Sequence, residues 1–323
     1  MRAVPARRRA RRALALALLV ALVGPGAAAA AAPTLGPPAL VAGAVPGDWA
    51  GLLPGRPVPF RPSASPVCRD GDPRCIEVTL ATMRRRLAGL AARCDHDAVF
   101  ALVYLRVTEE VRRALGAGDY RDPRWVAHQD AVFAADYYAV YDDWHAGRRA
   151  RVPAAWRIAF DAADRGTVSG LGDFVLAMNA HINRDMPYML ARIGLTRPDG
   201  RSHRPDHDVF DRRLARLYRP VLDEIAARFD PSADDVDLGP VDDALARGLL
   251  SGWRAIVWRN AEALALARDP AARALVASGI ERYAETQATI LRGLLAVDRR
   301  AADRRDRWCA AHGDDGPAVR RGR

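Results

Sequence analysis

Residues 76–90, IEVTLATMRRRLAGL, show the pattern that decides the fold. Met83, Leu87 and Leu90 recur at intervals of three to four residues, with three arginines between them. This spacing places the apolar side chains on one face of an α-helix. The helical period continues along the chain, and we find no alternating strand pattern of useful length. The sequence therefore predicts an all-α protein.

Glycine and proline residues divide this pattern into about eight helices, because glycine favours helix ends and proline favours the first turn. Pro187 lies late in the fifth helix and should kink it, since proline has no N–H to meet the carbonyl of Asn183. No composition shift divides the body, so we expect one multi-helix domain over residues 68–310. The expected helices are 76–93, 96–117, 123–146, 153–165, 168–194, 208–229, 239–268 and 270–299.

The ends of the chain differ from this body. Six arginines precede an apolar run from Ala13 to Val23, and small residues follow to Ala32. Eleven apolar residues suit a signal peptide and fall short of the roughly 20 of a bilayer span. We expect a signal peptide at 1–32, cleaved near Ala30 to Ala32; an uncleaved anchor is the alternative. Residues 33–67 should form a Pro/Gly-rich irregular arm, and 311–323 a disordered tail.

Export places the mature protein outside the cell or on the envelope exterior, with no stable membrane anchor. Cleavage would remove six arginines and no acid, so the net charge of +10 would fall to +4. This mild balance does not indicate nucleic acid, and we expect a small-molecule or envelope ligand instead. The arginine runs at 84–86 and 299–305 are expected to be solvated faces.

Four cysteines, Cys68, Cys75, Cys94 and Cys309, lie in the predicted mature chain. An even number in an exported protein indicates disulfides, and three pairings are possible. We favour Cys68–Cys75, whose loop contains turn-forming residues, together with Cys94–Cys309. A four-cysteine zinc site is the alternative, although the spacing lacks a C-x-x-C knuckle.

His181 and Asp185 form the sharpest candidate for a chemical site. Their spacing of four residues puts both side chains on one helix face, which they share with Phe174 and Met178. A histidine and a carboxylate on an apolar face cost free energy unless partners meet them. They could therefore belong to a functional site, with Asp185 as a metal ligand or catalytic base. The alternative is a buried, hydrogen-bonded structural pair.

Three further histidines lie on faces that should point inward. His128 shares a stripe with Val132 and Ala135, His96 shares a face with Phe100 and Glu110, and His207 shares one with Phe210 and Leu214. If these faces converge, His96, His128, His181, Asp185 and His207 could hold zinc or manganese, with Asp185 or Glu110 as catalytic base. Alternatively, His128 is a core residue, and the aspartates beside His96 and His207 are helix caps.

Longer motifs resemble a known family. The stretches Cys94-Asp-His-Asp-Ala-Val-Phe, Val126-Ala-His-Gln-Asp-Ala-Val-Phe, Met178-Asn-Ala-His-Ile-Asn-Arg-Asp-Met-Pro and Pro205-Asp-His-Asp resemble an actinobacterial family of unknown function, number 5995. The resemblance covers roughly residues 68–300 and brings no established activity. A weaker similarity, the H-x-x-x-D pair at His181 and Asp185, is to helical zinc-dependent phospholipase C and P1-nuclease enzymes. The tryptophan ligand and close third histidine of that group have no counterpart here.

These observations lead to two interpretations. The first is an exported metal-dependent hydrolase acting on a phosphoester or related bond. The second is a non-catalytic secreted binding protein, or an envelope-associated one, whose buried histidines are structural. The chain contains no nucleophile elbow, phosphate-binding loop, dinucleotide fingerprint or H-E-x-x-H motif, which weakens the corresponding enzyme classes.

Overall fold

The structure, a computed structural model, describes residues 53–234 and 240–313. These residues form helices and connecting loops, and the described part of the chain contains no β-sheet. The prediction of an all-α protein is confirmed. Its α-helices are α3 (Arg74–Ala91), α4 (Ala98–Gly116), α5 (Pro123–His145), α6 (Ala154–Asp164), α7 (Gly170–Asn179), α8 (Met186–Ile193), α9 (Arg204–Arg228), α10 (Pro240–Leu266), α11 (Pro270–Leu294) and α12 (Arg299–His312).

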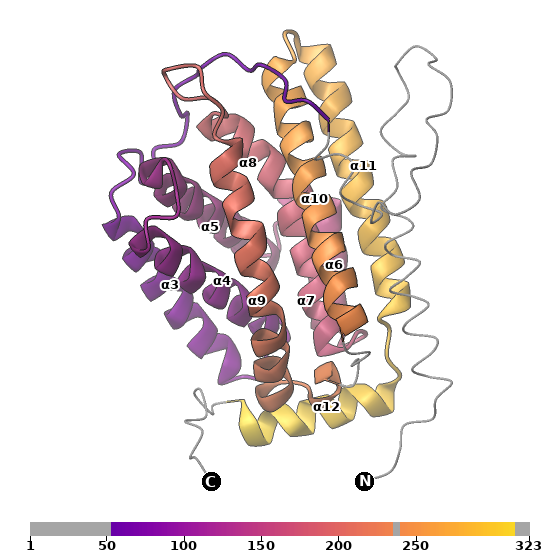
Figure 1. Cartoon of the computed structure of the whole chain (residues 1–323). Helices are drawn as coiled ribbons and strands as arrows, with labels where there is room; N and C mark the ends of the chain where they lie inside the picture. The colour runs from indigo at the N-terminus through magenta and orange to yellow at the C-terminus, as the bar shows by residue number, and fades with distance from the viewer. Residues whose placement is uncertain (1–52, 235–239, 314–323) are drawn as a thin grey trace.

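The helices pack around one apolar core (Figure 1). Helices α3, α4 and α5 form one side of the bundle, and α10 and α11 lie toward the other. Between them, α8 packs on α10 and α6 packs on α11, while α4 contacts both α7 and α9. The described helices therefore enclose a shared interior in which α4, α5, α7, α8, α9 and α10 all take part.

The fifth predicted helix is interrupted where a kink was expected. Helix α7 is followed by a π-helical turn, Ala180–Asp185, before α8 begins. The N–H of Met186 donates to the carbonyl of His181, five residues earlier, as a π-helix requires. Proline at 187 removes the next N–H of the ladder, and the wider turn accommodates that loss. This turn carries both His181 and Asp185.

The C-terminal region differs from the prediction. A single helix over 270–299 was expected, but α11 ends at Leu294 and a separate helix, α12, crosses one end of the bundle (Figure 1). Asp298 caps α12 by accepting from the N–H of Ala301, which explains why a new helix starts there. Helix α12 reaches His312, so the predicted disordered tail begins too early at 311. Residues 314–323 lie outside the described residues.

The arginine run at 299–305 is not wholly solvated, which corrects a second expectation. Arg305 is 4% exposed and pairs with the buried carboxylate of Asp173 on α7. The helical period explains this, because the buried face of α12 includes both Arg305 and Cys309, four residues later. An arginine at such a position is held by a partner and not by water.

Both favoured cysteine pairs are at disulfide distance. The Cα atoms of Cys68 and Cys75 lie 6.0 Å apart, and those of Cys94 and Cys309 lie 5.7 Å apart. The second pair joins residues 215 positions apart and ties α12 to the loop before α4. By the chain-entropy relation, closing so long a loop stabilises the folded state by about 5 kcal/mol.

The last part of the predicted arm, residues 53–67, packs on the bundle. The N–H of Ala64 donates to Arg192, and Val58 accepts from the hydroxyl of Thr196. Arg259 of α10 donates to the carbonyls of Leu53 and Pro54. The segment therefore crosses one end of the bundle from α10 toward α5 (Figure 1). The predicted signal peptide and residues 33–52 lie outside the described part of the chain.

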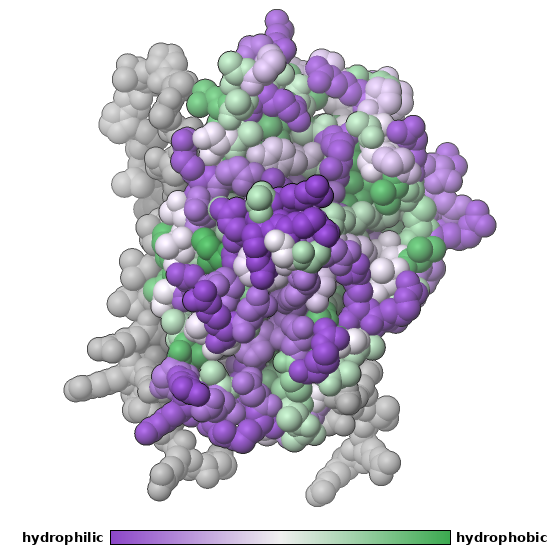
Figure 2. All heavy atoms as spheres, turned by 180° about the vertical axis from the view of Figure 1, so that it is seen from behind, coloured by the Kyte–Doolittle hydropathy of each residue, from purple (hydrophilic) through white to green (hydrophobic). Residues whose placement is uncertain are grey.

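The surface agrees with this arrangement. Figure 2 shows the face behind that of Figure 1 to be mainly hydrophilic, with apolar side chains in small separate patches. Among the described helices, none combines the length and apolarity needed to cross a bilayer. The apolar residues of the described chain are gathered mainly in the interior.

Candidate functional site

A cavity of about 130 Å³ lies inside the bundle between α4, α5, α7, α8, α9 and α10. Its wall is predominantly apolar and aromatic, since each of these amphipathic helices turns its apolar face inward. Representative wall residues are Phe100, Val107, Phe133, Met178, Phe210 and Leu217.

Two of the five predicted metal ligands, His181 and His207, line this cavity. His96, His128 and Asp185 do not belong to its wall, and neither does Glu110. The predicted site residues therefore fall into two groups, those that line the cavity and those that lie elsewhere in the structure.

His181 is buried and held by two neighbours. Its ring stacks on Phe133, with centroids 3.5 Å apart and planes 9° apart. Its Nδ1 lies 3.3 Å from Oδ2 of Asp185, while its Nε2 has no hydrogen-bond partner in the described structure. Burial lowers the pKa of this imidazole, and the contact with Asp185 only partly opposes the shift. The ring is therefore neutral near pH 7.

Asp185 is positioned by more than its histidine. The indole Nε1 of Trp156 donates to Oδ2 over 2.7 Å, and Nη1 of Arg184 donates to Oδ1 over 3.0 Å. The carboxylate is 3% exposed, so these donors compensate for the loss of water. Because both carboxylate oxygens act as acceptors here, the proton of neutral His181 belongs on Nδ1.

His207 lies in the first turn of α9, in another part of the wall. Neither ring nitrogen has a hydrogen-bond partner in the described structure, and the ring is 2% exposed. Burial lowers its pKa well below the ordinary histidine value, and the guanidinium of Arg254 adds to this effect. Arg254 also lines the cavity and donates to the carbonyl of His207.

Asp130 and Tyr104 are wall residues that the sequence analysis missed. Burial raises the pKa of Asp130 to about 7, and its Oδ2 has no hydrogen-bond partner in the described structure. The hydroxyl of Tyr104 is also buried without a partner, and burial keeps its pKa well above the ordinary value. One signal was available in the sequence: Asp130 shares a helix stripe with Val126 and Phe133, at intervals of four and three residues.

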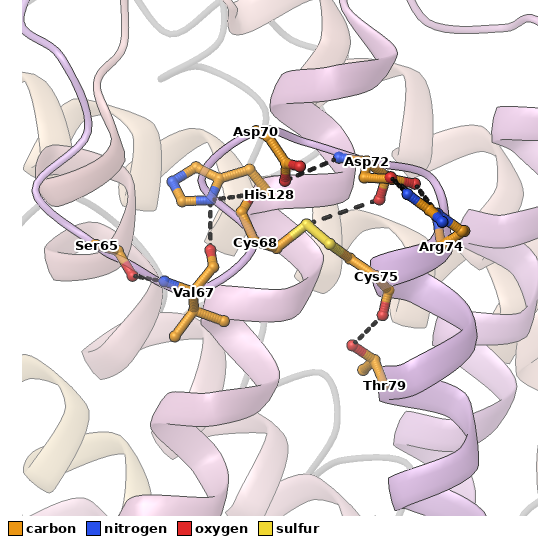
Figure 3. The surroundings of a disulfide bond; sticks show 9 residues. All are labelled: Ser65, Val67, Cys68, Asp70, Asp72, Arg74, Cys75, Thr79 and His128. Atoms are coloured by element: carbon orange, nitrogen blue, oxygen red, sulfur yellow. Dashed lines mark hydrogen bonds and ion pairs between the residues drawn. A yellow bond between two sulfur atoms is a disulfide. The ribbon is translucent and has the colours of Figure 1, made fainter.

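His128 has a structural role beside the Cys68–Cys75 disulfide (Figure 3). Its Nδ1 donates to the carbonyls of Val67 and Cys68 over 2.8 and 3.0 Å. Its Nε2 accepts from the hydroxyl of Ser63 over 2.6 Å. Both nitrogens are thus engaged in holding the preceding segment on α5, which matches the alternative interpretation of this histidine.

His96 and Glu110 are committed to ion pairs elsewhere. The ring nitrogens of His96 lie 3.4 Å from Asp173 and 3.1 Å from Asp306. The carboxylate of Glu110 accepts from Arg213 and Arg113 over 2.5 and 2.6 Å. These contacts engage the ring nitrogens of His96 and the carboxylate of Glu110, and neither residue lines the cavity.

The predicted metal ligands do not come together. Within the described residues, the one set of three or more ligand atoms lying within 4.8 Å of each other comes from Cys68, Asp70 and Cys75. Two of its members form a disulfide, so their sulfurs are not thiolate ligands. This arrangement does not fit zinc or manganese at the five predicted positions.

A family model matches residues 76–294 of this chain, and its description is a family of unknown function, DUF5995. The chain belongs to DUF5995. The matched region contains every wall residue of the cavity as well as His181 and Asp185, so the cavity lies within the DUF5995 part of the protein. No curated protein and no solved structure matches the chain.

Proposed function

We propose that this DUF5995 protein binds a small, mainly apolar organic molecule in the central cavity. The observation that carries the proposal is an apolar cavity with buried, unpartnered polar atoms on its wall residues. Such a combination of apolar wall and few polar groups is the common form of a small-molecule site. Buried polar groups without partners destabilise a fold. A bound ligand that pairs with them therefore explains their presence in the wall better than core packing does.

The volume of the cavity is large enough for a single aromatic ring. An apolar protein cavity of roughly 150 Å³ accommodates benzene, and the present one is about 130 Å³. A single aromatic ring of about 150 Å² buried at about 25 cal/mol per Å² would gain about 4 kcal/mol, which corresponds to a Kd of about 1 mM. A natural ligand that adds a hydrogen bond would bind more tightly.

Toluene is a suitable probe for this proposal. At five times its Kd, toluene should stabilise the folded protein by about 1 kcal/mol and raise Tm by about 2–4 °C. Val107→Phe adds bulk to the cavity wall and should abolish the shift, whereas Val78→Phe adds the same bulk at an exposed position on α3 and should preserve it. If toluene leaves Tm unchanged, or if Val107→Phe retains the full shift, the cavity does not bind ligands of this class.

A second candidate is hydrolysis of a small ester by the His181–Asp185 pair. A neutral imidazole whose Nδ1 proton is held by a carboxylate is the usual form of a general base. Nε2 would take a proton from water as its oxygen attacks the carbonyl, and would return it to the alkoxide as the ester C–O bond breaks. Release of phenol from phenyl acetate, lost in His181→Gln and retained in His128→Gln, would support this activity. Equal rates for wild type and His181→Gln would exclude it.

We also propose that the protein is exported. The basic and apolar segments at the N-terminus and the two cysteine pairs support this location. N-terminal sequencing of the protein from the culture medium should show a start near Ala30 to Ala32. Recovery of the uncleaved chain from the cytoplasm, with reduced cysteines, would contradict the proposal.

A further inference from the structure

We propose that the molecule bound in the cavity carries a hydroxyl group, which it donates to Nε2 of His181. The inference rests on the proposed binding function and adds the chemical class of the ligand, an apolar alcohol or phenol. The wall contains a buried hydrogen-bond acceptor without a donor, Nε2 of His181, and a ligand hydroxyl would supply that donor.

The contacts of Asp185 determine which ring nitrogen of His181 carries the proton. Both oxygens of Asp185 already accept hydrogen bonds, one from Trp156 and one from Arg184. Since both oxygens act as acceptors, Nδ1 of His181 is the donor of the 3.3 Å contact. In a neutral ring this leaves Nε2 with a lone pair and no hydrogen.

The lone pair on Nε2 of His181 has no hydrogen-bond partner in the described structure. Nε2 of His181 is buried and unpaired, on a residue that lines the cavity. A buried acceptor without a donor costs about 1–3 kcal/mol. Because stacking on Phe133 and the contact with Asp185 fix the ring plane, the imidazole cannot rotate freely to find another donor. A ligand that supplies a hydrogen recovers part of this cost.

The groups near Nε2 of His181 determine which kind of donor fits there. The hydroxyl of Tyr104 is also buried without a partner, on a ring whose centroid lies 4.8 Å from that of His181. A ligand hydroxyl can donate to the imidazole and accept from the phenol, whereas a carbonyl or carboxylate can only accept. An ammonium group would donate, but its desolvation in an apolar cavity costs several kcal/mol. The wall therefore selects a neutral hydroxyl.

Phenol and toluene test this inference because they have nearly the same shape and differ in one hydroxyl. Toluene is the more hydrophobic, so the quantity to measure is the ratio of their Kd values in each variant. His181→Phe keeps an aromatic ring and removes the acceptor. Relative to wild type, this variant should weaken phenol about tenfold against toluene, consistent with a net hydrogen bond of about 1.4 kcal/mol.

Val78→Phe is the matched control, since it introduces the same ring at an exposed position on α3 outside the cavity wall. It should change the phenol-to-toluene ratio less than twofold. His207→Phe removes the other buried imidazole of the wall and tests whether that histidine is the acceptor instead. A ratio that changes with His207→Phe and not with His181→Phe would overturn the assignment to His181. Circular dichroism and Tm establish that all three variants are folded before titration.

A measurement on the wild-type protein covers the case of an unfolded variant. With ¹⁵N-labelled histidine, phenol should move the resonance of the unprotonated His181 nitrogen toward the protonated value, and toluene should not. If toluene and phenol both bind but produce the same change at His181, the hydroxyl assignment is wrong while the binding function stands. If neither binds, the proposed function itself is wrong.

Discussion

Nδ1 of His181 and Oδ2 of Asp185 lie 3.3 Å apart on a single π-helical turn, and both residues are almost completely buried. Trp156 and Arg184 donate to the carboxylate of this pair, whereas His181 lines the cavity. The π-helical turn therefore carries both a carboxylate held by structural hydrogen bonds and a histidine that lines the cavity.

Asp185→Ala should destabilise the protein by about 3 kcal/mol, because it leaves the indole of Trp156 and Nδ1 of His181 without their acceptor and removes one of the carboxylates that pair with Arg184. Urea denaturation measures the free energy of unfolding. Asp199→Ala, which removes an exposed ion pair with Arg201, is the control and should leave the free energy of unfolding nearly unchanged. Equal losses in the two variants would mean that Asp185 does not anchor the turn.

The two disulfides should contribute unequally. Replacing Cys94 and Cys309 together by alanine removes a cross-link over 215 positions, whereas replacing Cys68 and Cys75 removes one over seven. The chain-entropy relation gives losses of about 5 and about 2 kcal/mol. Guanidinium denaturation of the two double variants checks this order. A smaller loss for the Cys94 and Cys309 variant would show that α12 contributes little to the folded state.

Arg305→Ala should destabilise the protein by about 3 kcal/mol, since it leaves the buried carboxylate of Asp173 without its guanidinium partner. Arg304 is exposed on the same helix, so Arg304→Ala should change stability by about 0.5 kcal/mol or less. Thermal unfolding of both variants distinguishes a buried ion pair from a solvated arginine run. Matching Tm values would favour the latter.

Asp130 should make stability depend on pH. Burial raises its folded-state pKa to about 7 from 3.8, so folding takes up a proton between these values and stability falls as pH rises through this range. Asp130→Asn removes the titration. Compared with this variant, the wild type should lose about 4 kcal/mol between pH 4 and pH 8, measured by urea denaturation. A constant difference across that range would contradict the raised pKa of this buried carboxyl.

The fold could be predicted largely from local patterns, and the site only in part. Helical spacing correctly placed His181 and Asp185 on one buried face, and the flanking prolines and glycines divided most helices correctly. Trp156 as the partner of Asp185 could not be predicted, because the contact joins two helices 29 residues apart in the chain. Such contacts depend on how the helices pack, which periodicity does not specify.

The sequence also could not show whether the five predicted metal ligands converge, for the same physical reason. The helical period of the sequence shows that a histidine lies on an inward face of its helix. It does not show which other parts of the chain that face contacts. His128 meets the segment before the Cys68–Cys75 loop, His96 meets Asp173 and α12, and only His181 and His207 reach the cavity. The separate helix α12 was missed because its buried face is formed by an arginine and a cysteine, which carry little apolar signal.

The central claim is that the cavity receives a small apolar molecule whose hydroxyl meets His181. The most direct measurement is a crystal structure of the protein grown with saturating phenol. The account predicts one phenol ring in the cavity, with its oxygen within hydrogen-bond distance of Nε2 of His181. An empty cavity at that concentration would contradict the binding function, and a ring whose oxygen points away from His181 would contradict the assignment of the hydroxyl.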